Sequence, residues 1–402
     1  MLSFAPFAPF GPLSPAMAAT VPPPVMAARR WLKAAPPPAH LPLINVSQAA
    51  PVDPPPEGLR AAMAEALLSR PEAHLYGPVL GLPALRDGLA ARMAQTYGAP
   101  VGAESVAITA GCNMAFCAAM ATLAAPGDAV ILPLPWYFNH AMWLTMTGVA
   151  PVALPTGPDL LPDPDAAEAL IGPATRAIVL VSPNNPAGVE YPPDLLAAFL
   201  ALARRHRIAL VIDETYRDFH AAEGAPHALF ADPDWDDTLI HLYSFSKAYR
   251  LTGHRVGALV AHPGRLAEAE KWLDTVAICA PQAGQHAALW GLENLSDWLA
   301  GERAEVLARR AALAQGAARL PGWRLDGVGA YFGWMRHPLP QSGAELAQRL
   351  LREAGVLALP GTMFAPGAGD AGAAHLRIAF ANLDRSGIAV LIDRLAALDP
   401  AA

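Results

Sequence analysis

Short apolar runs alternate with longer, more polar stretches from about residue 60 onward. The runs are rich in Val, Ile and Leu and predict strands at residues 106–109, 129–132, 177–181, 208–212, 239–243 and 256–261. The longer stretches predict helices at residues 58–69, 82–97, 113–123, 193–206 and 265–276. This alternation is typical of an α/β fold with a mostly parallel sheet.

The two ends of the chain follow other patterns. Of the 42 prolines, 15 lie in residues 1–60, and such a segment cannot form a continuous helix or a central strand. We therefore expect residues 1–60 to form an arm with one short helix at 25–33, which packs on a small C-terminal domain. A helical stretch with possible breaks, at 281–318, leads from a large domain (61–300) to that smaller α+β domain (301–402). In it we expect strands at 329–335 and 376–380 and helices at 344–354 and 385–397.

Composition excludes several classes of protein. The formal net charge of −7 argues against nucleic-acid binding, which needs a basic surface. The three cysteines, Cys112, Cys117 and Cys279, are too few for a disulfide scaffold and indicate a reducing compartment. Prolines interrupt each apolar stretch before it reaches the roughly 20 residues of a spanning helix, and the N-terminus lacks the pattern of a signal peptide. We therefore expect a cytoplasmic protein that binds neither nucleic acid nor membrane.

Lysine is rare in this chain, and one lysine has an unusual position. Of the 28 Lys and Arg residues only three are lysine, which leaves 28 − 3 = 25 arginines. Lys33 and Lys271 lie in stretches that predict solvated helical positions. Lys247 instead lies just past a predicted strand, in the segment SFSKAYRLTGHRVG. An arginine titrates too high to act as a base or to form a Schiff base, so Lys247 is a candidate for such chemistry.

Other chemically useful residues also follow predicted strands, and ligands of open α/β sheets bind at the carboxyl ends of strands. AGCNMA (110–115) is a glycine turn into a helix, which is either an ordinary turn or an anion site. PLPWYFNH (133–140) supplies aromatic rings for a core or for stacking on a flat ligand, and SPNNPAG (182–188) is rich in turn formers. DETY (213–216) puts an acidic residue at a buried strand end, where it needs a cationic partner.

Together these segments resemble the class I/II aminotransferases, the pyridoxal-phosphate enzymes with the aspartate-aminotransferase fold. The resemblance covers the chain from about residue 45 and is carried by PNNPAG, DETY and SxSKxxxxxGxRxG. The spacing agrees as well: 28 positions from Asn185 to Asp213, three from Asp213 to Tyr216, and eight from Lys247 to Arg255. The resemblance implies a seven-stranded, mostly parallel sheet flanked by helices in the large domain. It also implies pyridoxal 5'-phosphate as cofactor and a homodimer with shared active sites.

The resemblance assigns a role to each matching residue. Lys247 resembles the lysine that forms the internal aldimine and moves the proton, and Asp213 the carboxylate paired with the pyridinium nitrogen. Tyr216 and Asn185 resemble the hydrogen-bonding partners of the ring oxygen. Tyr137, with Trp136 as the alternative, resembles the aromatic residue stacked on the cofactor.

Further matching residues concern the phosphate and the substrate. The cofactor phosphate is expected to bind Gly111, Cys112, Asn113, Ser244, Ser246 and Arg255, together with Tyr76 of the neighbouring subunit. Arg377, in HLRIAFANLD, resembles the arginine that binds the substrate α-carboxylate, a bidentate task for which lysine is poorly suited. Asn185 and Tyr137 are also expected at the substrate. Ala49, in SQAAP, stands where the family has a glycine that contacts the substrate.

The expected reaction moves an amino group between an L-amino acid and a 2-oxo acid. Relatives specific for dicarboxylates use a second arginine from the partner subunit. The chain has no arginine between Arg265 and Arg303, and aromatic residues (Trp136, Phe138 and Phe364) are expected near the site, so a neutral or aromatic substrate is favoured. A lyase, a decarboxylase or a cyclising synthase with the same cofactor remains the alternative.

Three other readings have less support. A ligand sensor joined to a DNA-binding module would need more chain before the resemblance begins. The 12 histidines show no ligand spacing that predicts a metal site. GAGDAG (367–372) matches a dinucleotide-binding pattern, but a strand-like segment follows it where a helix is required, so we expect a loop.

Overall fold

A computed structural model describes residues 11, 13–366 and 372–398 of the chain. Its largest element is a seven-stranded sheet with the order β2-β8-β7-β6-β5-β3-β4. Only β8 runs antiparallel to its neighbours, so the sheet is mostly parallel, as the sequence predicts. The strands are β2 (Val106–Thr109), β3 (Ala129–Pro133), β4 (Ala150–Leu154), β5 (Thr175–Val181), β6 (Ala209–Asp213), β7 (Leu239–Ser244) and β8 (Gly257–Val260).

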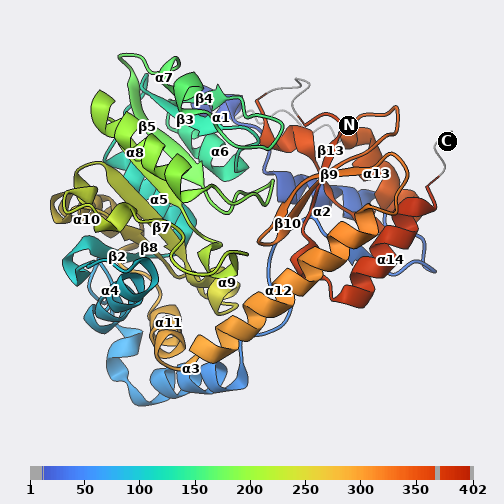
Figure 1. Cartoon of the computed structure of the whole chain (residues 1–402). Coiled ribbons are helices and arrows are strands. Elements are labelled where there is room, and N and C mark those ends of the chain that lie inside the picture. The colour runs from blue at the N-terminus through green and yellow to red at the C-terminus, as the bar shows by residue number, and fades with distance from the viewer. Residues whose placement is uncertain (1–10, 12, 367–371, 399–402) are drawn as a thin grey trace.

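Both faces of this sheet are buried, which explains why its strands read as continuous apolar runs. Side chains of a strand alternate between the two faces. In β5, Ile178 and Leu180 therefore belong to one hydrophobic core, and Ala177 and Val179 belong to the other. The helices around the sheet are α4 (Pro83–Tyr97), α5 (Cys112–Ala121), α6 (Phe138–Met146), α7 (Pro164–Glu168), α8 (Pro193–His206) and α10 (Pro263–Ala277) (Figure 1).

Two consecutive helices lead out of the large domain. The predicted helical stretch is broken at Leu295 into α11 (Gln282–Asn294) and α12 (Ser296–Ala317). Figure 1 shows α12 running from the region of α3 and α11 to the small domain. The predicted boundary at residue 300 therefore falls inside α12. Across the described part of the chain, no helix has both the length and the hydrophobicity needed to cross a bilayer.

The small domain is built on a four-stranded antiparallel sheet with the order β12-β13-β10-β9. This arrangement agrees with the expected α+β character. The strands are β9 (Arg324–Gly329), β10 (Phe332–Arg336), β12 (Leu359–Pro360) and β13 (His375–Ile378), and the helices are α13 (Gly343–Ala354) and α14 (Arg385–Ala396).

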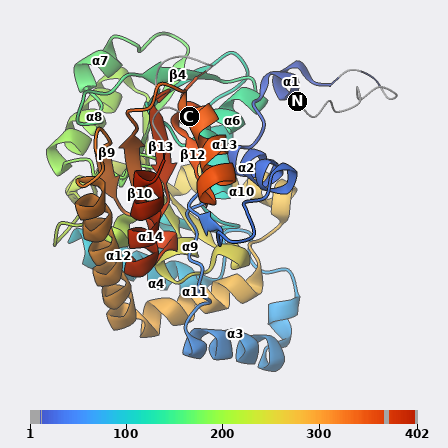
Figure 2. The same ribbon diagram turned by 90° about the vertical axis from the view of Figure 1, so that its right-hand side faces the viewer.

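The arm contacts both domains. It contains α1 (Pro15–Ala19), α2 (Pro24–Ala34) and β1 (Ile44–Asn45), which pairs in parallel with β11 (Val356–Leu357) of the small domain. Figure 2 shows α2 beside the small domain and α1 near α6. The predicted boundary at residue 60 falls inside α3 (Glu57–Ser69), which packs on α11.

Several sequence-based element predictions need correction. The strand predicted at 329–335 is a hairpin, in which β9 ends at Gly329 and β10 begins at Phe332; Ala330 between them has a positive φ of 45°. Strand β4 was not predicted, because Pro151 interrupts its pattern; proline is tolerated there since β4 lies at the edge of the sheet. Helix α6 was missed because its aromatic and apolar residues show no clear helical period. Residues 367–371 of the GAGDAG segment lie outside the described residues.

Candidate active site

A cavity of about 410 Å³ lies at the carboxyl ends of the central strands. It is enclosed by the large domain, the small domain and the arm. Twelve of the residues predicted for the site line it: Ala49, Cys112, Asn113, Tyr137, Asn185, Asp213, Tyr216, Ser244, Ser246, Lys247, Arg255 and Arg377. Segments more than 300 positions apart in the sequence therefore meet in one cavity.

Lys247 lies in α9 (Phe245–Ala248), directly after β7. Its Nζ donates a hydrogen bond of 2.7 Å to the carbonyl oxygen of Ala49 and lies 5.9 Å from the centre of the Tyr216 ring. Burial, reinforced by the positive charges of Arg255 and Arg377, lowers the pKa of Lys247 to about 7. A large fraction of the amine is therefore neutral and nucleophilic near neutral pH.

Asp213 ends β6 with its carboxylate in the cavity. Oδ1 accepts hydrogen bonds from the backbone N–H (3.0 Å) and the hydroxyl (2.7 Å) of Thr215, and Oδ2 lies 3.3 Å from Nε2 of His140. Burial by itself would raise the pKa of Asp213, but His140 and Thr215 outweigh it, and the net effect is a lowered pKa. The buried carboxylate is thus held ionised.

Oδ1 of Asp213 also accepts from Sγ of the predicted Cys112 at 3.6 Å, but sequence reasoning missed the other two partners, His140 and Thr215. His140 lies on α6 and stacks on the ring of Phe116 at a centroid distance of 4.0 Å, which holds the imidazole in place. Thr215 belongs to the DETY segment itself. The only sequence signal for His140 is its place at the end of PLPWYFNH, a segment in which the aromatic rings are the more evident feature.

One end of the cavity gathers hydrogen-bond donors. Gly111, with φ of +89°, precedes α5, so the first two N–H groups of that helix, from Cys112 and Asn113, have no acceptor within the helix. Arg255 donates only to the carbonyl oxygens of Thr252 (3.0 Å) and Ala110 (3.4 Å) among the described residues.

Ser244 and Ser246, which each carry a hydroxyl, line the same cavity. Gly111 does not line the cavity itself, but a Cβ at this position would lie 2.0 Å from Nη2 of Arg255. A donor set of this kind, at a helix N-terminus and without an acid partner in the described chain, suits a phosphate group.

Arg377 brings a second positive charge from β13 of the small domain. Its Nη1 donates to Oδ1 of Asn185 at 3.1 Å, and its Nη2 donates to the carbonyl oxygen of Ser47. The guanidinium lies against the rings of Phe332 and Phe364, 5.1 and 4.9 Å from their centres.

The side chain of Arg377 is 2% exposed, and burial lowers its pKa to about 10. Within the described chain its hydrogen-bond acceptors are neutral. A buried guanidinium in this situation favours binding of an anion.

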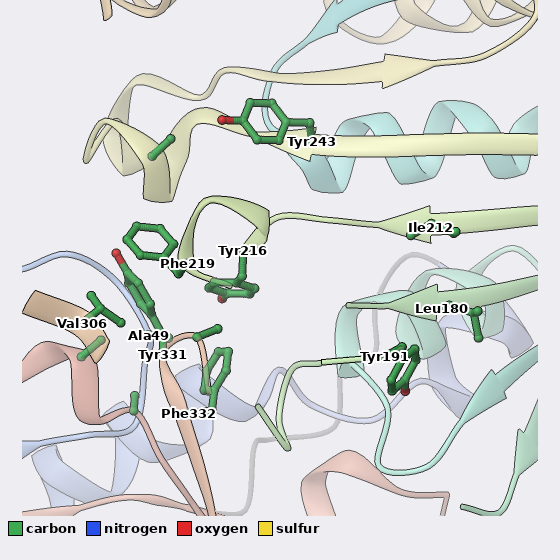
Figure 3. Close-up of a cluster of buried hydrophobic side chains, with 14 of the residues drawn as sticks. Ala49, Leu180, Tyr191, Ile212, Tyr216, Phe219, Tyr243, Val306, Tyr331 and Phe332 are labelled. Carbon is green, nitrogen blue, oxygen red and sulfur yellow. The ribbon is translucent and has the colours of Figure 1, made fainter. Parts of the chain in front are cut away.

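Tyr137 and Tyr216 line the cavity, whereas Trp136, the alternative to Tyr137, does not. Tyr137 donates to Oδ1 of Asn113 at 3.3 Å and accepts from Nδ2 of Asn139 at 2.9 Å. Trp136 is buried and does not line this cavity, so the geometry favours Tyr137 as the aromatic residue available to a ligand. Tyr216 lies just beyond the end of β6, with its ring 5.2 Å from that of Phe332 (Figure 3).

The predicted Tyr76 does not line the cavity of this chain. It follows a short 3-10 helix (Pro71–His74) on the surface and is 80% exposed. Its predicted role concerns the neighbouring subunit, so this position on a single chain leaves that role a prediction.

One side of the cavity was not predicted at all. It is formed by arm residues, which we call the arm wall: Pro23, Val25, Met26, Arg29 and Gln48. These residues belong to a proline-rich segment without a recognisable motif, and only the tertiary structure brings them to the site.

Comparisons with known proteins agree with this geometry. The family model described as aminotransferase class I and II matches residues 42–395. The valine–pyruvate aminotransferase of Mycobacterium tuberculosis is 32% identical over 90% of this chain and 92% of its own length. A probable aspartate/prephenate aminotransferase of Thermus aquaticus is 30% identical over 76% of this chain and 79% of its own.

A solved structure supports the same assignment. The aspartate aminotransferase from Thermus thermophilus with maleate superposes with a TM-score of 0.87 at 26% identity, covering 96% of this chain and 99% of that one. The chain therefore belongs to the class I and II aminotransferases, a family of transaminases that depend on pyridoxal 5'-phosphate.

Proposed function

We propose that this enzyme transfers an amino group between an L-amino acid and a 2-oxo acid, with pyridoxal 5'-phosphate held covalently by Lys247. The observation that carries the proposal is the meeting of three groups in one cavity: the buried amine of Lys247, the ionised carboxylate of Asp213 and the buried guanidinium of Arg377. Transamination requires an amine that moves a proton, a counter-charge for the cofactor ring and a cation for the substrate carboxylate.

The residues of the cavity fit the cofactor. Gly257 supports this fit, since a Cβ there would lie 2.6 Å from the backbone nitrogen of Cys112, one of the donors assigned to the phosphate. Asp213 would pair with the ring nitrogen, Asn185 and Tyr216 would donate to the ring oxygen, and the ring face would lie against Tyr137. The phosphate would bind the N–H groups of Cys112 and Asn113, the hydroxyls of Ser244 and Ser246, and Arg255.

When bound, pyridoxal phosphate supplies an aldehyde that condenses with amines and a ring that accepts the electron pair released at the substrate α-carbon. Asp213 remains ionised because His140 and Thr215 stabilise its charge, and it can thus hold a proton on the ring nitrogen. Lys247, a large fraction of whose amine is neutral near pH 7, would take the proton from the α-carbon and return it to another atom of the bound substrate and cofactor. Arg377 binds the α-carboxylate in two hydrogen bonds and so orients the bond to be broken.

The side chain of the substrate would lie toward the arm wall. Val25, Met26 and Phe138 give this part of the cavity apolar surface, which supports a neutral or aromatic amino acid as one substrate. The enzyme would act as a homodimer in which the exposed Tyr76 reaches the phosphate site of the partner subunit.

Transamination is tested by mixing the purified enzyme with single amino acids and following the absorbance of the bound cofactor. We expect several neutral or aromatic amino acids to convert the aldehyde form to the amine form, and a 2-oxo acid to restore the starting spectrum. Release of ammonia or sulfide without this restoration would contradict transamination and favour a lyase.

The pKa of Lys247 predicts a pH dependence for covalent capture of the cofactor. Since the pKa is about 7, the amine of the cofactor-free enzyme is mostly protonated below this pH. The concentration of the neutral, reactive amine therefore falls about tenfold for each pH unit below 7. We expect the rate of borohydride-trapped incorporation of pyridoxal phosphate to reach half its plateau near pH 7. Nα-acetyllysine, whose amine has an ordinary pKa of about 10.4, is the reference compound for an unperturbed lysine. A midpoint above about pH 9 for the enzyme would contradict the described environment of Lys247.

A further inference from the structure

A cluster of buried polar side chains adjoins the turn that follows β6. We call it the Glu214 cluster, and it consists of Tyr97, Glu214, Arg217, His227 and His241. Tyr97 is the last residue of α4, His241 lies in β7, and His227 lies in the connection between β6 and β7. None of the five residues is more than 4% exposed, and none of them lines the cavity. The proposed mechanism therefore leaves this cluster without a role.

The carboxylate of Glu214 is the centre of the cluster. Its Oε2 accepts a hydrogen bond from the hydroxyl of Tyr97. The same oxygen lies 2.8 Å from Nε2 of His241 and 3.4 Å from Nε2 of His227. Burial by itself would raise the pKa of Glu214, but the two histidines outweigh it and hold the pKa well below its usual range. The carboxylate is therefore a fixed charge that holds groups from three other segments of the chain.

Arg217 supplies the positive charge of the cluster. Its Nη1 donates to the hydroxyl of Tyr97 at 3.5 Å, so this one hydroxyl joins Arg217 to Glu214. The guanidinium also lies 3.9 Å from the centre of the ring of Tyr243, on β7 beside the turn (Figure 3). The hydroxyl of Tyr243 in turn donates to Oδ2 of Asp218 at 2.8 Å. The turn is therefore held by side-chain contacts from Glu214 to Asp218.

The cluster and the cavity share this turn. Asp213 and Tyr216 line the cavity, and each is followed directly in the chain by a member of the cluster, Glu214 or Arg217. The backbone N–H of Glu214 donates to the carbonyl oxygen of Leu242 at 2.9 Å, and that of Arg217 donates to the carbonyl oxygen of Glu214 at 3.1 Å. Contacts that fix Glu214 and Arg217 therefore also fix the backbone from which the two cavity residues project.

We propose that the Glu214 cluster positions the turn so that Asp213 meets the ring nitrogen of the cofactor and Tyr216 meets the ring oxygen. This inference rests on the proposed function, which gives Asp213 and Tyr216 these roles. Stability alone explains the cluster poorly, because well-packed apolar residues of similar volume often stabilise a fold as well as buried charges do. A connected polar network instead holds its members in one arrangement, and reacting groups need such support to keep their geometry.

Tyr97→Phe is the sharpest test, because it removes the hydroxyl that joins Glu214 to Arg217 and keeps the ring, which stacks on His227 at 4.7 Å. Small displacements of reacting groups cost up to about 100-fold, so we expect kcat to fall by about 10- to 100-fold. The KM for the amino donor should stay nearly unchanged, because Arg377 of the small domain hydrogen-bonds outside the cluster.

Two further variants complete the comparison. Glu214→Gln keeps the shape of the side chain but removes its charge, and it should lower kcat at least as much as Tyr97→Phe does. Phe199→Leu is the matched control for a loss of stability, because Phe199 is fully buried in α8 and does not line the cavity. It should lower Tm and leave kcat unchanged.

The absorbance of the bound cofactor gives a readout that does not depend on turnover, since it responds to the groups that pair with the ring nitrogen and the ring oxygen. Tyr97→Phe and Glu214→Gln should change this spectrum and lessen the rise in Tm when pyridoxal phosphate is added to the cofactor-free enzyme. Phe199→Leu should change neither. A lowered Tm with wild-type kcat and spectrum in both cluster variants would overturn the inference. Cluster variants with an altered spectrum, alongside a wild type that transaminates no amino acid, would overturn the proposed function alone.

Discussion

Replacing Lys247 by alanine should abolish transamination, with a loss of at least about a thousandfold in kcat, because in the proposed function the amine both holds the cofactor and moves the proton. Two observations support this effect. Lys247 is the only lysine that lines the cavity within the described chain. Its pKa of about 7 gives it a neutral amine where an ordinary lysine would be charged.

The measurement combines activity with covalent trapping. After treatment with borohydride, the wild type should carry a stable cofactor adduct on the peptide that contains Lys247, and Lys247→Ala should carry none. Lys271→Ala is the matched control, because Lys271 is exposed in α10 and pairs with Glu268 at 2.8 Å. An adduct that persists on Lys33 or Lys271 in the Lys247→Ala variant would refute the assignment. The folded state of the variant is checked by its Tm.

The positions of Lys247, Asp213 and Asn185 in one cavity could be predicted from the sequence for a physical reason. Each follows an apolar run that forms a strand of the large sheet, and neighbouring parallel strands end at the same edge. Asp213 is the last residue of β6 and Lys247 lies three residues beyond the end of β7, so little chain intervenes that could direct them elsewhere. Local sequence patterns sufficed because the strands that position these residues are themselves recognisable from those patterns.

The arm wall and His140 could not be predicted in the same way. Arg29 reaches the cavity through the packing of Ala28 and the pairing of β1 with β11, which joins residues more than 300 positions apart. His140 contacts Asp213 because α6 packs beside α5, where Phe116 holds the imidazole. Such contacts between distant segments leave no local period or motif, and the hairpin at Ala330 was missed for a similar reason, since a tight turn was hidden within one apolar run.

Replacing Asp213 by asparagine should lower kcat/KM by about 100- to 1,000-fold while leaving the cofactor attached to Lys247. The amide keeps an oxygen that can accept from the N–H of Thr215, which is 3.0 Å from Oδ1 in the wild type. It removes the negative charge that we propose to pair with the ring nitrogen and that lies 3.3 Å from Nε2 of His140. An amide at position 213 would no longer hold a proton on the ring nitrogen, which would weaken the cofactor as an acceptor of the electron pair from the α-carbon.

Covalent trapping distinguishes this loss from that of Lys247→Ala. Asp213→Asn should retain the borohydride-stable adduct on Lys247 and show a steep loss in the rate of proton removal from the α-carbon. We expect Asp213→Glu, which keeps the charge but displaces it by one methylene, to retain more activity than the amide does. Asp213→Asn enzyme that keeps more than about a tenth of the wild-type kcat/KM would show that the charge contributes less than about 1.4 kcal/mol to the transition state. The ring nitrogen would then need another partner, and His140, whose Nε2 lies 3.3 Å from Oδ2 of Asp213, would be the next residue to replace.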